Sequence, residues 1–136
     1  MIIAIDFDGT CTTHEYPYIG EDIGAVPILK ELVANGHKLI LYTMRSDKPG
    51  ISPITHKLED GGLQDAIKWF EDNDIPLYGI QTNPTQAIWT SSPKCYAELY
   101  IDDAAVGCPL IYNKHKRPYV DWRAVRTLLH NIKVLR

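Results

Sequence analysis

Short apolar runs alternate with amphipathic segments along the chain. The runs are rich in β-branched residues, which is typical of buried strands. They predict strands over residues 2–7, 38–42, 76–80, 97–101 and 109–112. Apolar residues at helical spacing predict helices over residues 25–33, 63–73 and 120–132, with Asp121 as the N-cap of the last. Because strands and helices alternate, we expect a mainly parallel sheet covered on both faces, a three-layer α/β/α sandwich.

The segments between these elements are polar or interrupted by proline. Residues 11–22 predict a loop, residues 45–60 an irregular flexible loop, and residues 83–93 a loop with a short helix. The basic cluster Lys114–Arg117 is typical of a solvated loop. No repeat or change of composition indicates a second domain, so we expect one domain over residues 1–136.

Composition narrows the class of protein. The chain is 45% hydrophobic and 23% charged, as in ordinary globular proteins. A net charge of −3 disfavours a general nucleic-acid binder without excluding one. Three cysteines, Cys11, Cys95 and Cys108, cannot all pair and lack zinc-site spacing. With no apolar leader or membrane-length run, we expect a cytoplasmic protein with reduced thiols and no membrane contact.

Polar residues follow the predicted strands at the ends where ligands of parallel sheets bind. These residues are Asp6, Asp8, Thr43, Asp102 and Asp103, with Lys94 shortly before the fourth strand. Four converging carboxylates repel one another unless a cation lies between them. Oxygen ligands without a histidine or cysteine partner favour Mg²⁺ over Zn²⁺. The pattern therefore predicts a magnesium site among the four aspartates. Mg²⁺ typically takes one or two carboxylates, which leaves another free for chemistry.

The same residues can transfer a phosphoryl group. An aspartate carboxylate can attack phosphorus, and a second one can protonate the leaving oxygen and then activate water. Thr43 and the backbone amides of Asp8, Gly9 and Thr10 can hold phosphate oxygens. Glycine at position 9 allows the close approach of the backbone, and Lys94 can neutralise charge in the transition state.

This set of residues resembles the motifs of the haloacid dehalogenase (HAD) superfamily of phosphohydrolases. The matching segments are Asp6-Phe7-Asp8-Gly9-Thr10, the apolar strand ending at Thr43, Lys94, and Tyr100-Ile101-Asp102-Asp103. The resemblance implies a Rossmann-like core with Asp6 as nucleophile and Asp8 as acid/base. It also implies that Mg²⁺ binds the Asp8 carbonyl and Asp102, with Asp103 binding it directly or through water.

A closer resemblance is to small, uncharacterised hydrolases of this superfamily, through Tyr16-Pro17 and Thr43-Met44-Arg45. In this superfamily, cap domains are inserted just after the first motif or between the second and the third. Here the first of these segments, residues 11–22, is only a loop, and the second holds one helix and one strand that the core itself needs. We therefore expect a chain without a cap domain. An open site suits a bulky phosphorylated substrate, or closure by a neighbouring copy in a homo-oligomer.

Several residues near the motifs have two interpretations. Arg45 and Met44 are candidates for substrate binding, but Arg45 can equally pair with an acid such as Asp47. His14 and Tyr16 can select substrate or pack on the surface. Trp89 can cover the site, bind another chain or simply pack. Cys11 has no histidine partner in the sequence pattern and is interpreted as a packing residue.

The sequence as a whole predicts a magnesium-dependent phosphomonoester hydrolase that forms an aspartyl-phosphate at Asp6. One alternative is a phosphotransferase of the same superfamily, and another is a catalytically silent binding protein on the same fold. A phospho-receiver domain is disfavoured because the third strand runs into Gln81-Thr82-Asn83 rather than an aspartate.

Overall fold

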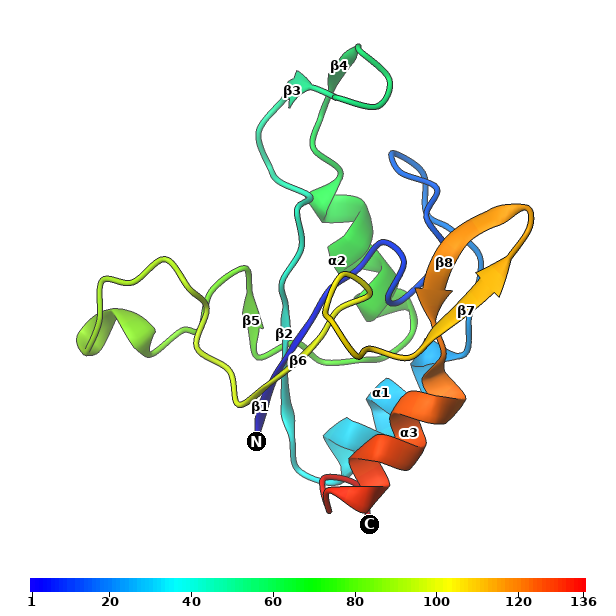
Figure 1. The fold of residues 1–136 in the computed structure, drawn as a ribbon. Coiled ribbons are helices and arrows are strands. Elements are labelled where there is room, and N and C mark those ends of the chain that lie inside the picture. Colours follow the sequence, from blue (N-terminus) through cyan, green and yellow to red (C-terminus); the bar gives the residue numbers. More distant parts are fainter.

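A computed structural model describes residues 1–136 and has a parallel sheet of four strands at its centre (Figure 1). The strands, in spatial order, are β5 (Gly79–Ile80), β2 (Lys38–Leu41), β1 (Ile2–Ile5) and β6 (Leu99–Ile101). Ile3 pairs with Leu39 on one side and Leu99 on the other, so β1 is central. The predicted α/β class with a mainly parallel sheet is confirmed.

Three helices pack on one face of this sheet. They are α1 (Ala25–Ala34), α2 (Leu63–Asp72) and α3 (Trp122–Asn131). The buried residues of all three helices belong to one apolar cluster with Ile3 and Ile5 of β1, whereas Ala4 is outside this cluster. Successive residues of a strand point to opposite faces of the sheet, so Ile3 and Ile5 point to one face and Ala4 to the other. The three helices therefore pack on the face that carries Ile3 and Ile5. As predicted, Asp121 caps α3, with its carboxylate accepting from two backbone amides. None of the helices is long and apolar enough to cross a lipid bilayer.

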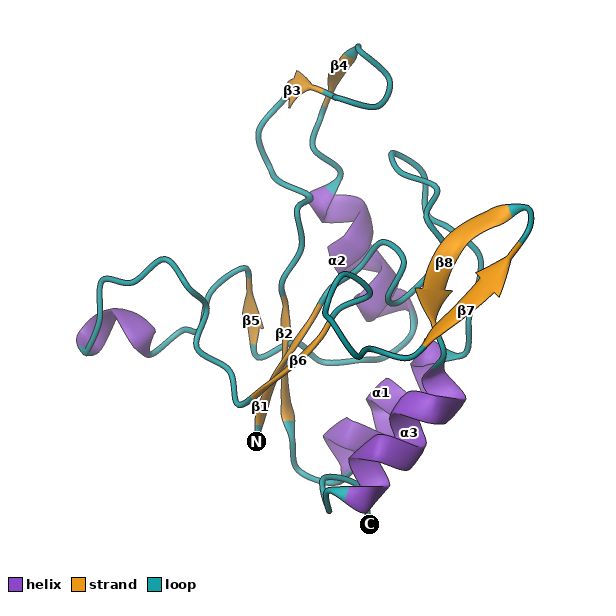
Figure 2. Cartoon of the chain, in the orientation of Figure 1, coloured by secondary structure: helices purple, strands orange, loops and turns teal.

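On the opposite side of the sheet, residues 82–96 contain only the short helix η1 (Gln86–Ile88) and run out beyond β5 (Figures 1 and 2). Ala4 and Ile40 are buried on this side, as is Cys95 of this segment. The β1–α1–β2 and β2–α2–β5 crossovers advance in the same direction across the sheet, and right-handed crossovers then place both helices on one face. Hence a loop segment stands where we expected helices.

Two antiparallel hairpins depart from the sequence predictions. The predicted strand 109–112 does not extend the parallel sheet: β7 (Leu110–Asn113) pairs with β8 (Lys116–Val120), and the basic cluster forms the turn and start of β8. Two strand segments separated by two residues pair locally, without a crossover. The second hairpin, β3 (Gly50–Ile51) with β4 (Leu58–Glu59), lies within the predicted loop 45–60 and projects beyond the sheet (Figure 1).

The stem of the β3–β4 hairpin is fixed by close backbone contact. The amide of Ser46 donates to the carbonyl of Gly61 at 3.0 Å. Gly61 has a φ of +94°, and a Cβ at this position would lie 2.1 Å from the Ser46 carbonyl oxygen. Only glycine fits this position, so the hairpin leaves the core at a defined point.

Candidate functional site

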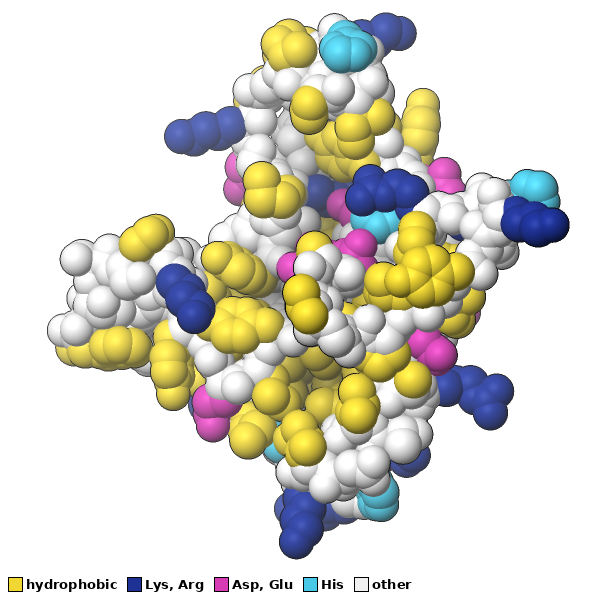
Figure 3. Space-filling view, in the orientation of Figure 1, with side chains coloured by type: hydrophobic (Ala, Val, Ile, Leu, Met, Phe, Trp, Pro, Cys, Tyr) yellow, Lys and Arg dark blue, Asp and Glu magenta, His cyan; other side chains and the backbone are white.

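A cavity of about 570 Å³ lies at the carboxyl ends of β1, β2 and β6. Most of the predicted site residues line it: Asp6, Asp8, Thr43, Met44, Arg45, Asp102 and Asp103. Ser52, Pro53 and Ile54 of the β3–β4 hairpin border it, and Arg117 of β8 also lines it. Figure 3 shows acidic, histidine and basic side chains gathered beneath the projecting hairpin.

Three carboxylates form the acidic part of the cavity. Asp6, Asp102 and Asp103 each offer an oxygen within 4.8 Å of the others. The Thr10 hydroxyl donates to Asp6 Oδ2 at 2.7 Å and accepts from the Asp103 amide at 3.0 Å. Thr10 therefore joins the ends of β1 and β6, which explains why a residue predicted to face substrate is fully buried.

Burial and crowding control the charge of this cluster. Burial, with the neighbouring Asp103 carboxyl, raises the pKa of Asp6 to about 8. Burial also raises the pKa of Asp102. For Asp103, burial opposes ionisation, but hydrogen bonds from His14 and Asp6 outweigh it and lower the pKa. Carboxylate oxygens this close together suit a hard divalent cation such as Mg²⁺, because the cation would offset the repulsion between the carboxylates.

His14 lies against the acidic cluster. Its Nε2 donates to Asp103 Oδ2 at 2.8 Å, and both side chains are largely buried. This contact depends on Gly9, because a Cβ there would lie 2.0 Å from His14 Nε2 and 2.7 Å from Asp103 Oδ2. The glycine of the first motif thus makes room for a histidine.

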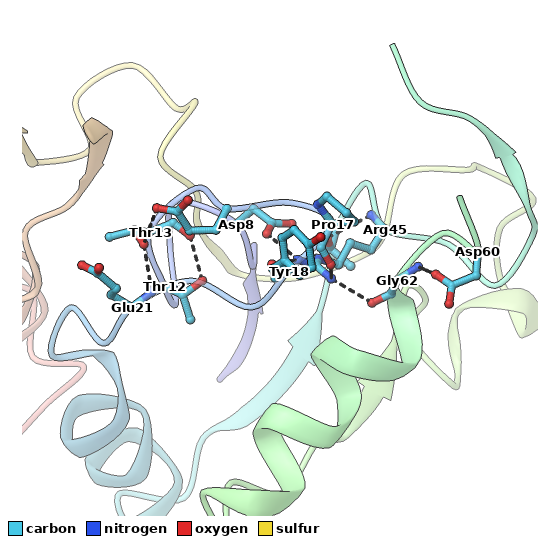
Figure 4. A network of polar contacts seen from close by, with 11 residues as sticks. Asp8, Thr12, Thr13, Pro17, Tyr18, Glu21, Arg45, Asp60 and Gly62 are labelled. Carbon is cyan, nitrogen blue, oxygen red and sulfur yellow. Dashed lines mark hydrogen bonds and ion pairs between the residues drawn. The ribbon is translucent and has the colours of Figure 1, made fainter. Parts of the chain in front are cut away.

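Arg45 binds Asp8 instead of a surface acid. Its Nε and Nη2 donate to the two Asp8 carboxylate oxygens, each at 2.8 Å. The guanidinium also donates to the carbonyls of Pro17, Tyr18 and Gly62 (Figure 4). The Arg45 side chain is 1% exposed. The Asp8 carboxylate is therefore held apart from the three-carboxylate cluster.

Gln81 shapes the segment that carries Thr43 and Arg45. Its Oε1 accepts from the Thr43 amide at 2.9 Å, and its Nε2 donates to the carbonyls of Thr43 and Arg45 at 2.8 and 2.6 Å. The Thr43 hydroxyl accepts from the Arg45 amide, which leaves its own proton available to a ligand. This role of Gln81 was not predicted, although the residue directly follows the third strand predicted from the sequence, as Thr43 follows the second.

The backbone amides of Gly9 and Thr10, which were predicted to hold phosphate oxygens, make hydrogen bonds within the protein. The Gly9 amide donates to the Thr12 carbonyl at 2.8 Å, and the Thr10 amide donates to the Phe7 carbonyl at 3.0 Å. The tight turn after β1 uses both donors to close itself, so neither is free for a ligand.

Lys94 is not brought into the cavity, contrary to its predicted catalytic and binding roles. It lies in the segment on the far side of the sheet, and its Nζ is 5.6 Å from the Tyr100 ring centroid. Trp89 lies in the same segment and packs edge-on against Tyr96 rather than covering the site. Cys11 is fully buried in the apolar cluster, where burial raises its thiol pKa, as expected for a packing residue.

The fold and cavity define an α/β protein with an acidic site at the carboxyl edge of a parallel sheet. Comparison with known families finds no match, and no curated protein matches the sequence. The solved structure of a conserved protein from Bacteroides thetaiotaomicron is similar, with 32% identity and a TM-score of 0.72. The alignment covers 98% of this chain and 92% of that one. The chain belongs to the same family as that conserved protein.

Proposed function

We propose that this chain is a magnesium-dependent phosphomonoester hydrolase with a HAD-like catalytic core. The observation that carries the proposal is the convergence of Asp6, Asp102 and Asp103 within 4.8 Å, in one cavity with Thr43. A half-buried carboxylate beside two further carboxylates and a hydroxyl donor suits nucleophilic attack on a phosphate ester.

The chemistry divides between residues of three strand ends. The Asp6 carboxylate attacks phosphorus as the ester P–O bond breaks, and water then attacks the aspartyl-phosphate and releases inorganic phosphate. Thr43 donates to a phosphoryl oxygen. Asp6, Asp102 and Asp103 would hold Mg²⁺, which when bound supplies charge compensation for the carboxylates and phosphoryl oxygens.

Asp8 is the candidate for proton exchange with the substrate. In its protonated form it gives its proton to the leaving oxygen, and the carboxylate so formed, which pairs with Arg45, then takes a proton from the attacking water. It lines the cavity, and its ion pair with Arg45 fixes its orientation. Both of its oxygens accept hydrogen bonds from Arg45, so one of these bonds must lengthen when Asp8 exchanges a proton with substrate. Arg45 is thus a positioning residue for Asp8.

A catalytically silent binding protein on the same fold is a second candidate. It is favoured by one observation, the position of Lys94 outside the cavity, because this leaves the transferring phosphoryl group without its expected lysine.

The test is release of inorganic phosphate from sugar phosphates, nucleotides and phosphorylated oligonucleotides, with and without Mg²⁺. We expect magnesium-dependent turnover of at least one of these esters. Calorimetric Mg²⁺ binding without turnover of any ester would favour the binding protein.

A further inference from the structure

Arg117 is the basic side chain of the cavity that has no partner within the protein. Of the other two, Arg45 pairs with Asp8 and His14 with Asp103. The Arg117 side chain makes no hydrogen bond or ion pair and is exposed. A guanidinium offers a planar set of donors that matches a carboxylate or a phosphate.

Side chains of β8 alternate between the two sides of the hairpin, and Arg117 is on the side that faces the cavity. Its neighbour Lys116 points the other way and pairs with Glu15 and Glu21. The strand is anchored where the Val120 amide donates to the Gly9 carbonyl at 2.9 Å, beside the turn after Asp6. Arg117 lies three residues before this anchor, or roughly 10 Å along the strand.

This position is at the rim rather than beside the nucleophile. A cation that stabilises the transferring phosphoryl group acts best when buried and preorganised, whereas Arg117 is exposed to solvent. Across the cavity, Pro53 and Ile54 of the β3–β4 hairpin present apolar surface. A substrate phosphorylated at one end and anionic at the other would fill this space.

We propose that Arg117 binds a second anionic group of the substrate, so that preferred substrates are phosphomonoesters that carry another phosphate or a carboxylate. This inference rests on the function proposed above. It makes Arg117 a determinant of substrate specificity, with the apolar hairpin contacting the part of the substrate between the two anions.

Matched pairs of esters test the inference by turnover. The pairs are fructose 6-phosphate with fructose 1,6-bisphosphate, adenosine 5′-monophosphate with adenosine 3′,5′-bisphosphate, and thymidine 5′-monophosphate with a 5′-phosphorylated thymidine trinucleotide. We expect the second anion to raise kcat/KM about tenfold or more, mainly through KM. Arg117→Gln should reduce this ratio to near one. Lys114→Gln removes a charge from the same hairpin outside the cavity and should keep the ratio.

The pairs also separate possible sources of the second anion. A preference for the two small bisphosphates identifies metabolite-sized substrates, and a preference confined to the trinucleotide identifies a nucleic-acid end. Either result supports a second-anion site if it depends on Arg117. Equal kcat/KM within all three pairs, or a preference that survives Arg117→Gln, would overturn the inference.

Binding without turnover separates this inference from the proposed function. Calorimetry with Asp6→Asn in Mg²⁺ should give tighter binding of each dianionic ester than of its partner, and Asp6→Asn with Arg117→Gln should not. Preferential binding combined with an inactive wild-type protein would support the Arg117 site and contradict the phosphatase. Turnover without any preference, in rate or in binding, would leave the phosphatase standing and overturn the Arg117 site.

Discussion

Replacing the buried Arg45 tests whether the ion pair with Asp8 organises the site. Arg45→Met keeps an apolar stem but removes the donors to both Asp8 oxygens and to three backbone carbonyls. The Asp8 side chain is only 18% exposed, so it would remain as a poorly solvated charge. Breaking a buried ion pair by removing one partner costs about 3–5 kcal/mol, and we expect this loss in the free energy of unfolding.

Urea denaturation of wild type, Arg45→Met, Asp8→Asn and the double variant forms a double-mutant cycle. Because the two residues contact each other, the losses should not add, with a coupling of about 2 kcal/mol. Arg126→Met is the matched control, since Arg126 makes an equally bidentate pair with Glu31 at the surface. If Arg45→Met destabilises the protein no more than Arg126→Met, the Arg45–Asp8 pair does not organise the site.

Three further predictions concern the acidic cluster and its supports. The pKa of Asp6, raised to about 8, means that the native state holds a proton that the unfolded chain releases near pH 4. The free energy of unfolding in EDTA should therefore fall as the pH rises from about 4 to about 8, and Asp6→Asn should flatten this fall in urea titrations. Mg²⁺ should raise the thermal midpoint of wild type at pH 8, and Asp102→Asn should reduce this shift as measured by calorimetry. Trp122→Phe removes the bond from Nε1 to the Thr10 carbonyl and should cost about 1–3 kcal/mol in urea, whereas the exposed Trp89→Phe should cost little.

The sequence predicted the features that depend on local patterns. Strand ends at Asp6 and Asp102 follow from apolar runs that stop at acidic residues, and parallel strands bring such ends to one edge. The N-cap at Asp121 follows from its position before an amphipathic run. These inferences need only periodicity and a topology rule, so they did not require knowledge of packing.

Features that depend on tertiary contacts were not predictable in this way. The Arg45–Asp8 pair joins residues far apart in sequence, and Asp47 was an equally good partner by spacing. Lys94 was assigned to the site from its position before a strand, but the backbone path of residues 82–96 takes it to the far face. The β7–β8 hairpin was missed because a basic cluster resembles a solvated loop, although Lys116 is paired and Arg117 lines the cavity.

The measurement that tests the central claim most directly is phosphate release by wild type and Asp6→Asn, purified side by side. The matched control is Asp72→Asn, because Asp72 is an exposed acid on α2 that lies outside the cavity. With Mg²⁺ and the best ester of the panel, wild type and Asp72→Asn should release phosphate at equal rates, and Asp6→Asn should release none above background. Equal rates from all three proteins would contradict an aspartyl-phosphate at Asp6.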